Sequence, residues 1–107
     1  MTDDEYIVVL ITTSSSEEAE KIGRALVEGR LAACVNVVPE IKSFFPWQGK
    51  LEEEREALMI VKTKASLFPS LAERVKALHS YTVPEIIALP IQIGSHAYLR
   101  WIDEVTG

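Results

Sequence analysis

The sequence contains a single cysteine, Cys34, among 107 residues. One cysteine excludes a disulfide within the chain and is typical of proteins in a reducing compartment. The first residues are acidic and include no apolar signal segment. No apolar run reaches the length of about 18 residues that a membrane-spanning helix requires. These absences predict a cytoplasmic protein with no membrane partner.

Positive charge is also scarce. Eleven basic residues against sixteen acidic residues give a formal net charge of −5, and the basic residues form no cluster. Proteins that bind nucleic acid carry a basic surface, so nucleic acid is excluded as a partner. The length and the hydrophobic fraction of 48% are typical of one globular domain. We therefore expect a single domain over residues 1–107.

Motifs for catalysis and for strong metal binding are missing as well. The sequence has no Gly-x-Ser-x-Gly, no Walker A loop, no Gly-x-Gly-x-x-Gly, and neither Cys-x-x-Cys nor His-x-x-x-His. Three consecutive serines, Ser14–Ser16, are explained by helix capping, with Glu17 or Glu18 completing a capping box. The acidic run Glu52–Glu56 is expected to be solvated, although such a run can bind hard cations weakly. We expect no enzymatic activity.

A long β-hairpin is the most prominent feature that is present. Two arms, Cys34–Pro46 and Leu51–Thr63, flank a turn in which Gly49 supplies the positive φ angle. Each arm of about 13 residues would extend roughly 40 Å. A globule of this size has a radius of gyration of only about 13 Å. The outer half of the hairpin therefore requires a partner.

The two halves of the hairpin differ in character. Ala57–Val61 is apolar on consecutive residues, as in a central strand, whereas Glu52–Glu56 is polar on both faces. Pro39 marks an edge position or a bulge, because it lacks the N–H that a strand ladder uses. Three aromatic residues near the tip indicate a contact surface: Phe44, Phe45 and Trp47.

The remaining segments predict alternating strands and helices. We expect strands at Tyr6–Ile11 and Glu85–Leu89, and helices from about residue 15 to Glu28, from Leu67 to Leu78 and from Ser95 to Val105. The last helix is expected to bury Tyr98, Trp101 or Ile102, and Val105.

This order is β-α-β-β-α-β followed by a terminal helix, which predicts an α+β, ferredoxin-like fold with an extended β-hairpin. Two helices then cover one face of a four-stranded sheet. The other face also needs cover, and oligomerisation through the sheet would supply it.

Few side chains stand out as candidates for function. His79 ends a helix, where the helix dipole favours an imidazolium, and it can also be a simple C-terminal cap. Glu85 begins a strand and can pair with Lys62 across neighbouring strands. Cys34 is more often a small buried residue than a ligand. His96 is expected to be exposed.

Five segments carry a resemblance to a known family: Ala32–Pro39 (AACVNVVP), Ser43–Lys50 (SFFPWQGK), Val61–Thr63 (VKT), His79–Ile91 (HSYTVPEIIALPI) and Tyr98–Trp101 (YLRW). In this order they resemble the CutA divalent-cation tolerance family, and the match extends over nearly the whole chain. The resemblance implies a homotrimer of ferredoxin-like subunits with an architecture similar to PII signalling proteins. It also implies a cytoplasmic role in tolerance of copper and other divalent metals, without a defined enzymatic activity.

The chain departs from the family at positions linked to metal. Some members have a cysteine where this chain has Ile11, and a His-His pair where it has Leu78 and His79. Ser80 replaces a proline of the family. Among these ligand-type positions, the resemblance leaves His79 as the metal ligand.

Two functions follow as hypotheses. In the first, His79 and carboxylates of a neighbouring subunit bind a divalent metal, with no metal held tightly. Copper(I) would favour the thiolate of Cys34, and copper(II) would favour imidazole and carboxylate. In the second, a PII-like trimer binds a small molecule or a protein tail in a cleft between subunits. That cleft would be lined by Cys34, Lys62, Glu85 and Trp47.

Overall fold

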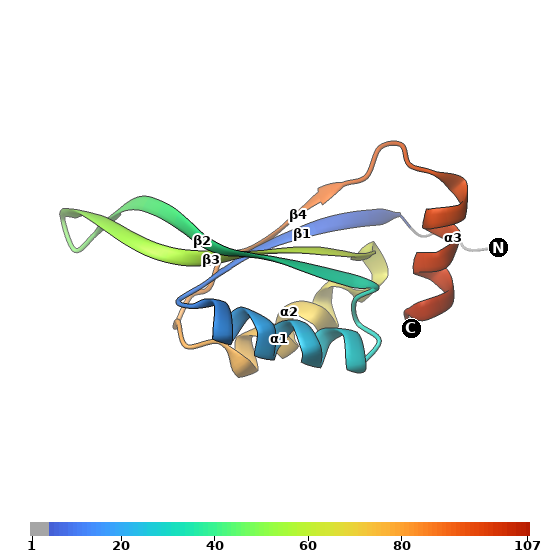
Figure 1. The fold of residues 1–107 in the computed structure, drawn as a ribbon, viewed down its shortest axis with the longest axis horizontal. Coiled ribbons are helices and arrows are strands. Elements are labelled where there is room, and N and C mark those ends of the chain that lie inside the picture. The colour runs from blue at the N-terminus through green and yellow to red at the C-terminus, as the bar shows by residue number, and fades with distance from the viewer. Residues whose placement is uncertain (1–4) are drawn as a thin grey trace.

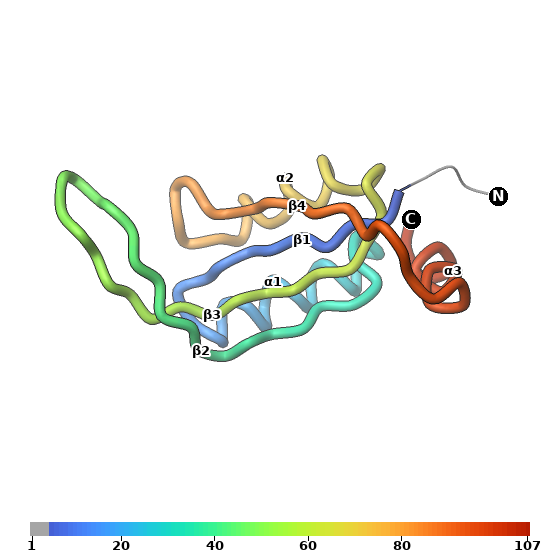
Figure 2. Tube along the Cα trace, turned by 90° about the horizontal axis from the view of Figure 1, so that it is seen from above, coloured from blue at the N-terminus to red at the C-terminus, as the bar shows by residue number. Residues whose placement is uncertain are grey.

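The computed structural model describes residues 5–107. Its elements are β1 (Tyr6–Thr13), α1 (Ser16–Glu28), β2 (Cys34–Trp47), β3 (Lys50–Lys64), a 3₁₀ turn (Ala65–Leu67), α2 (Phe68–Leu78), β4 (Ile86–Pro90) and α3 (His96–Val105). The four strands form one antiparallel sheet in the order β2-β3-β1-β4, which can be followed in Figure 2. This confirms the predicted α+β, ferredoxin-like arrangement with a terminal helix.

The core lies between the sheet and two helices. Helices α1 and α2 cover one face of the sheet, and α3 lies at the end of the sheet away from the hairpin turn (Figure 1). Successive strand residues point to opposite faces, so alternate residues of β1 and β3 face the helices. The largest fully buried apolar side chains come from these strands and helices: Val9, Ile11, Ile22, Leu26, Met59, Val61, Leu71, Val75 and, from α3, Ile102.

Local sequence signals explain where α1 begins. Ser15 is the N-cap, and its hydroxyl accepts a hydrogen bond from the Glu18 N–H at 3.1 Å. In a capping box the acidic side chain returns to the N-cap N–H. Here the Glu18 carboxylate accepts instead from the N–H of Ser14, at 2.9 Å. The predicted pair of Ser15 and Glu18 is therefore confirmed, with one bond displaced by one residue.

The β2–β3 hairpin extends well beyond the rest of the molecule. Gln48 and Gly49 have φ angles of 51° and 78°, which is the geometry of a tight two-residue hairpin turn. The register between β2 and β3 shifts near Pro39. Val38 pairs with Leu58 and Ile41 pairs with Glu56, so β2 has one residue more than β3 between these two pairs. The longest dimension is 49 Å against 25 and 22 Å, and the projecting hairpin accounts for it (Figure 1). The predicted overhang and bulge are confirmed.

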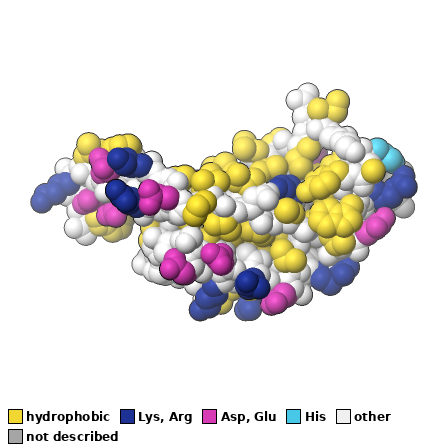
Figure 3. Space-filling model, viewed as in Figure 1, with side chains coloured by type: hydrophobic (Ala, Val, Ile, Leu, Met, Phe, Trp, Pro, Cys, Tyr) yellow, Lys and Arg dark blue, Asp and Glu magenta, His cyan; other side chains and the backbone are white. Residues whose placement is uncertain are grey.

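The sheet face that α1 and α2 leave uncovered is mainly apolar, and we call it the open face. Figure 3 shows apolar side chains between the hairpin and α3. On β4, Ile87 and Leu89 are 51% and 52% exposed. Register pairing places the following strand residues on the open face: Tyr6, Val8, Leu10, Thr12, Cys34, Asn36, Val38, Leu58, Ile60, Lys62, Lys64, Ile87 and Leu89.

Two expectations about side-chain burial were wrong. Helix α3 buries Ile102, one of the two expected alternatives, but leaves Tyr98 at the surface, because the helix lies against the end of the sheet rather than a full face. Glu56 is buried rather than solvated, because Tyr81 from the loop after α2 covers it and donates a hydrogen bond to it. Among residues 5–107, no helix is long and apolar enough to cross a membrane.

Candidate functional site

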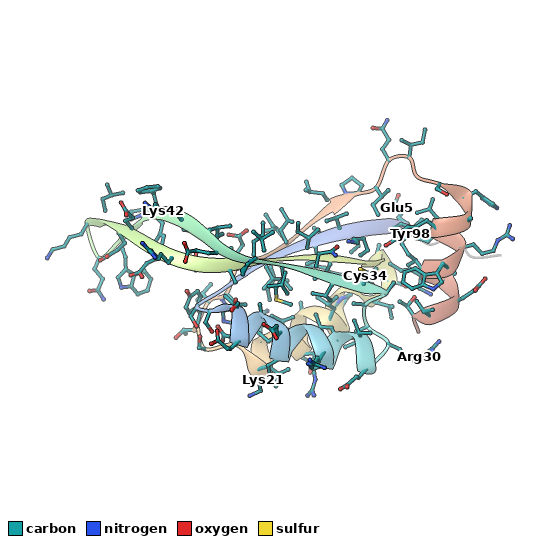
Figure 4. The ribbon with its side chains drawn as sticks, in the orientation of Figure 1. Glu5, Lys21, Arg30, Cys34, Lys42 and Tyr98 are labelled. Atoms are coloured by element: carbon teal, nitrogen blue, oxygen red, sulfur yellow. The ribbon has the colours of Figure 1, made fainter. Side chains whose placement is uncertain are left out.

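Two clusters of residues with polar contacts lie beside different parts of β3. The first, which we call the closed cluster, consists of Thr12, Glu18, Glu56, His79, Ser80 and Tyr81 and adjoins the base of the hairpin. The second, which we call the open cluster, consists of Cys34, Asn36, Lys62, Tyr98 and Trp101 and adjoins α3. Figure 4 shows Cys34 and Tyr98 near each other beside that helix.

His79 lies at the centre of the closed cluster. Its side chain is fully buried. The Nε2 atom is 2.7 Å from the carbonyl oxygen of Thr12, which can only accept a hydrogen bond, so Nε2 carries the proton. The Nδ1 atom accepts a hydrogen bond from the N–H of Tyr81 at 3.0 Å, so it carries none. These two contacts fit the tautomer of His79 that carries its hydrogen on Nε2, and His79 is also the C-cap of α2.

Two carboxylates belong to the closed cluster. Glu18 accepts hydrogen bonds from Ser14 and from the N–H of Ser80, the latter at 2.7 Å. Burial raises the pKa of Glu18, but these hydrogen bonds outweigh it and lower the pKa to about 2. Glu56 accepts from the Tyr81 hydroxyl at 2.7 Å. Burial and this bond raise the pKa of Tyr81.

The closed cluster offers a metal ion little free coordination in this arrangement. Both ring nitrogens of His79 are occupied, and a ligating imidazole must present a free nitrogen. The nearest carboxylate oxygen, from Glu18, is 3.9 Å from Nδ1. Among residues 5–107 there is no group of three or more His, Cys, Asp or Glu side chains that could hold a metal ion. A metal site on one subunit would therefore require these hydrogen bonds to open.

The open cluster joins two residues that the sequence analysis assigned to a cleft. Cys34 and Lys62 lie directly opposite each other on β2 and β3. Both side chains contact Asn36: the Lys62 ammonium donates to its Oδ1 atom, and the Cys34 Sγ lies 3.8 Å from the same atom. The thiol and the ammonium are thus brought together through one side-chain amide.

Two aromatic residues of α3 complete the open cluster. Burial, followed by the neighbouring Cys34, raises the pKa of the Tyr98 hydroxyl. The rings of Tyr98 and Trp101 lie 5.5 Å apart between centroids, at an angle of 42°. They remain 40% and 39% exposed. The two rings therefore form an accessible aromatic surface, and Tyr98 lies next to the Cys34 thiol.

Glu85 and Trp47 do not join this cluster within one subunit. The expected pairing of Lys62 with Glu85 was wrong, because β1 lies between β3 and β4 and the partner of Lys62 is Asn36. Glu85 is exposed just before β4, and Trp47 is 61% exposed at the hairpin turn. His96 is exposed, as expected, and contacts Arg100.

Sequence reasoning missed several members of both clusters. Asn36 could have been noticed, because it is a polar residue two positions from Cys34 and shares its strand face. Tyr98 was assigned to the core from its helical spacing, and Trp101 was given as an alternative to Ile102. Glu18 was recognised only as a capping residue. Its contact with Ser80 joins residues 62 positions apart, and no local pattern signals such a contact.

Comparisons with known proteins agree with the fold. A model of the CutA1 divalent ion tolerance protein family matches residues 7–105. The divalent-cation tolerance protein CutA of Thermus thermophilus is 59% identical over 100 residues, covering 94% of this chain and 97% of that protein. Human protein CutA is 48% identical over 96 residues, covering 90% of this chain but only 54% of the human protein.

Solved structures lead to the same group of proteins. The divalent cation tolerance protein of Thermus thermophilus superposes with a TM-score of 0.93 at 58% identity, covering 95% of this chain and 99% of the other. A CutA protein of Archaeoglobus fulgidus described as periplasmic gives a TM-score of 0.91 at 50% identity, covering 94% and 97%. An Arabidopsis thaliana relative is described as chloroplastic.

Proposed function

The chain belongs to the CutA1 divalent ion tolerance protein family, and from that premise we propose that it is a cytoplasmic homotrimer that binds divalent metal ions, including copper. The family is described by ion tolerance rather than by a reaction, in agreement with the expectation that the chain is not an enzyme. The observation that supports assembly is the open face together with the hairpin. Ile87, Leu89 and the exposed tip residues Phe44 and Trp47 all need apolar cover.

A homotrimer would cover these surfaces with identical ones. Each hairpin would lie against the sheet of a neighbour, which also protects its unpaired strand edges. Multi-angle light scattering should give about three times the subunit mass of 11.9 kDa. A mass near that of one subunit at micromolar concentration would refute the assembly.

The hairpin tip offers a sharper test. If a neighbour buries Trp47, Trp47→Ala should weaken assembly by about 3–5 kcal/mol, as truncation of buried aromatic residues does. Lys21→Ala on the exposed side of α1 is the control (Figure 4). Equal dissociation of the two variants on dilution would mean that Trp47 stays at the surface.

We keep His79 as the proposed transition-metal ligand, with modest affinity. Metal at Nδ1 would replace the N–H of Tyr81, and a carboxylate oxygen of Glu18, 3.9 Å from Nδ1, would be a second ligand. Because those bonds must break first, we expect copper(II) to bind weakly. Calorimetric titration should show a loss of affinity in His79→Gln but not in His96→Gln. Unchanged affinity in His79→Gln would remove His79 from the site.

The open cluster supports a second function, a binding module with a ligand in the cleft between subunits. The specific observation is that Cys34 and Lys62, predicted for such a cleft, are direct neighbours beside an exposed aromatic pair.

The cytoplasmic location rests on the single cysteine, which has no partner for a disulfide within the chain. Cell fractionation would test it, since relatives described as periplasmic and chloroplastic exist.

A further inference from the structure

The charge of the open face is opposite to that of the whole chain. The net charge of the chain is −5, yet where β3 pairs with β1 the strand residues of the open face include two lysines, Lys62 and Lys64, and no carboxylate. At the edge of this region, the Asp103 carboxylate of α3 accepts a hydrogen bond from the Tyr6 hydroxyl. The positions next to Lys62 on the face are Val8 on β1, Ile60 and Lys64 on β3, and Cys34 directly opposite on β2. Lys62 therefore lies between an apolar part of the face, formed by Val8 and Ile60, and the polar side chain of Asn36.

The polar groups of the open cluster are mainly donors. Lys62 carries three N–H groups, and the described partner of its ammonium is the neutral oxygen of Asn36. That oxygen also faces the Cys34 thiol, so it is fully engaged. The amide nitrogen of Asn36, with two more N–H groups, has no hydrogen-bond acceptor among residues 5–107. The cluster thus presents several donors and a positive charge without an acceptor of opposite charge.

Assembly would raise the free-energy cost of leaving the Lys62 ammonium without an anionic partner. A trimer that covers the open face, as proposed above, takes the Lys62 ammonium partly out of water. A buried charge without a partner of opposite sign is unfavourable, whereas hydrogen bonds between ions are stronger than neutral ones. Either a bound anion or a carboxylate of a neighbouring subunit would supply the Lys62 ammonium with a partner of opposite charge.

We propose that the open cluster binds a small organic anion, with its carboxylate or phosphate on Lys62 and Asn36 and its planar part against Tyr98 and Trp101. The exposed rings of Tyr98 and Trp101 offer flat apolar contact next to the donors. A free divalent cation is disfavoured at this point, because the fixed ammonium of Lys62 repels it.

The proposal rests on the trimer suggested above and can be tested on the intact protein with benzoate as the probe. Benzoate combines a carboxylate with a planar ring, and benzamide is its uncharged analogue. We expect benzoate to shift the NMR signals of the Asn36 side-chain amide and the Trp101 indole. Benzamide should bind about tenfold more weakly or worse, since it lacks the charge.

Three variants locate the charge that is needed. Lys62→Gln should weaken benzoate binding about tenfold or more, and Lys21→Gln, which removes the same charge from α1, should not. Asn36→Asp places a carboxylate next to Lys62 and should abolish benzoate binding while the fold is kept. Light scattering on the same samples reports assembly separately.

Three results would overturn the proposal. Equal binding of benzoate and benzamide would reduce the cluster to an apolar patch. Unchanged benzoate binding in Lys62→Gln would exclude the ammonium. An intact trimer that binds no benzoate, and that dissociates more readily as Lys62→Gln, would show that a neighbour supplies the carboxylate. In each case a trimer seen by light scattering would leave the assembly proposal standing.

Discussion

The closed and open clusters lie on the same sheet and differ in how their polar groups are satisfied. In the closed cluster, both nitrogens of His79 and the carboxylates of Glu18 and Glu56 have partners within the chain. In the open cluster, the partner of the Lys62 ammonium among residues 5–107 is a neutral amide oxygen. Buried polar groups that are fully paired stabilise one conformation, whereas groups left without partners are free to bind something else. The comparison assigns structure mainly to the first cluster and binding to the second.

Removal of Glu18 should have the largest effect. Glu18→Ala takes away the acceptor for the N–H groups of Ser14 and Ser80, and it removes an acidic residue from the first turn of α1. We expect a loss of about 2 kcal/mol in the free energy of unfolding. The control is Glu17→Ala, one residue earlier and exposed. Urea titration at one protein concentration measures both, and equal losses would mean that the closed cluster contributes no special stability.

Acid should weaken the closed cluster through the same carboxylate. The pKa of Glu18 is lowered from 4.5 to about 2 in the folded chain. A lowered carboxyl pKa gives stability that is complete above pH 4.5 and is lost as pH falls toward 2. The difference in unfolding free energy between the parent and Glu18→Gln should therefore shrink over this range. A difference that stays constant from pH 6 to about pH 2 would contradict the assigned ionisation.

Matched removal of a hydroxyl from each cluster gives the next smaller effect. Tyr81→Phe leaves the buried Glu56 carboxylate without its donor, so we expect a loss of about 1.5 kcal/mol in the free energy of unfolding. Tyr98→Phe should cost under about 0.5 kcal/mol, because the Tyr98 side chain is substantially exposed and water can replace the hydroxyl. Thermal unfolding compares the two variants. Similar losses would remove the distinction between the clusters.

The smallest effect is expected for the charge of Lys62. Lys62→Met keeps an apolar side chain of similar length and removes an ammonium that has no carboxylate partner in the described chain. The unfolding free energy should change by less than about 0.5 kcal/mol, or rise slightly. A loss as large as that of Glu18→Ala would show that the open cluster is structural after all.

Local sequence patterns determined the elements of this protein. The alternation of apolar residues, the serines before α1, Gly49 at the turn and Pro39 at the bulge each act through neighbours within a few residues, so they can be read without a structure. The length of the hairpin arms likewise predicted the overhang. The proximity of Cys34 and Lys62 also follows in part from the sequence, because Cys34 lies in one arm of the hairpin and Lys62 in the other.

Tertiary structure decided what the side chains do. The insertion of β1 between β3 and β4 separates Lys62 from Glu85, and strand order depends on how the whole sheet is wound rather than on either strand. The tautomer of His79 is set by Thr12, 67 residues away along the chain. The contact of Glu18 with Ser80 and the docking of Tyr98 beside Cys34 are equally remote in sequence. A residue's own neighbours carry no information about such partners, because packing brings them together only when the chain has folded.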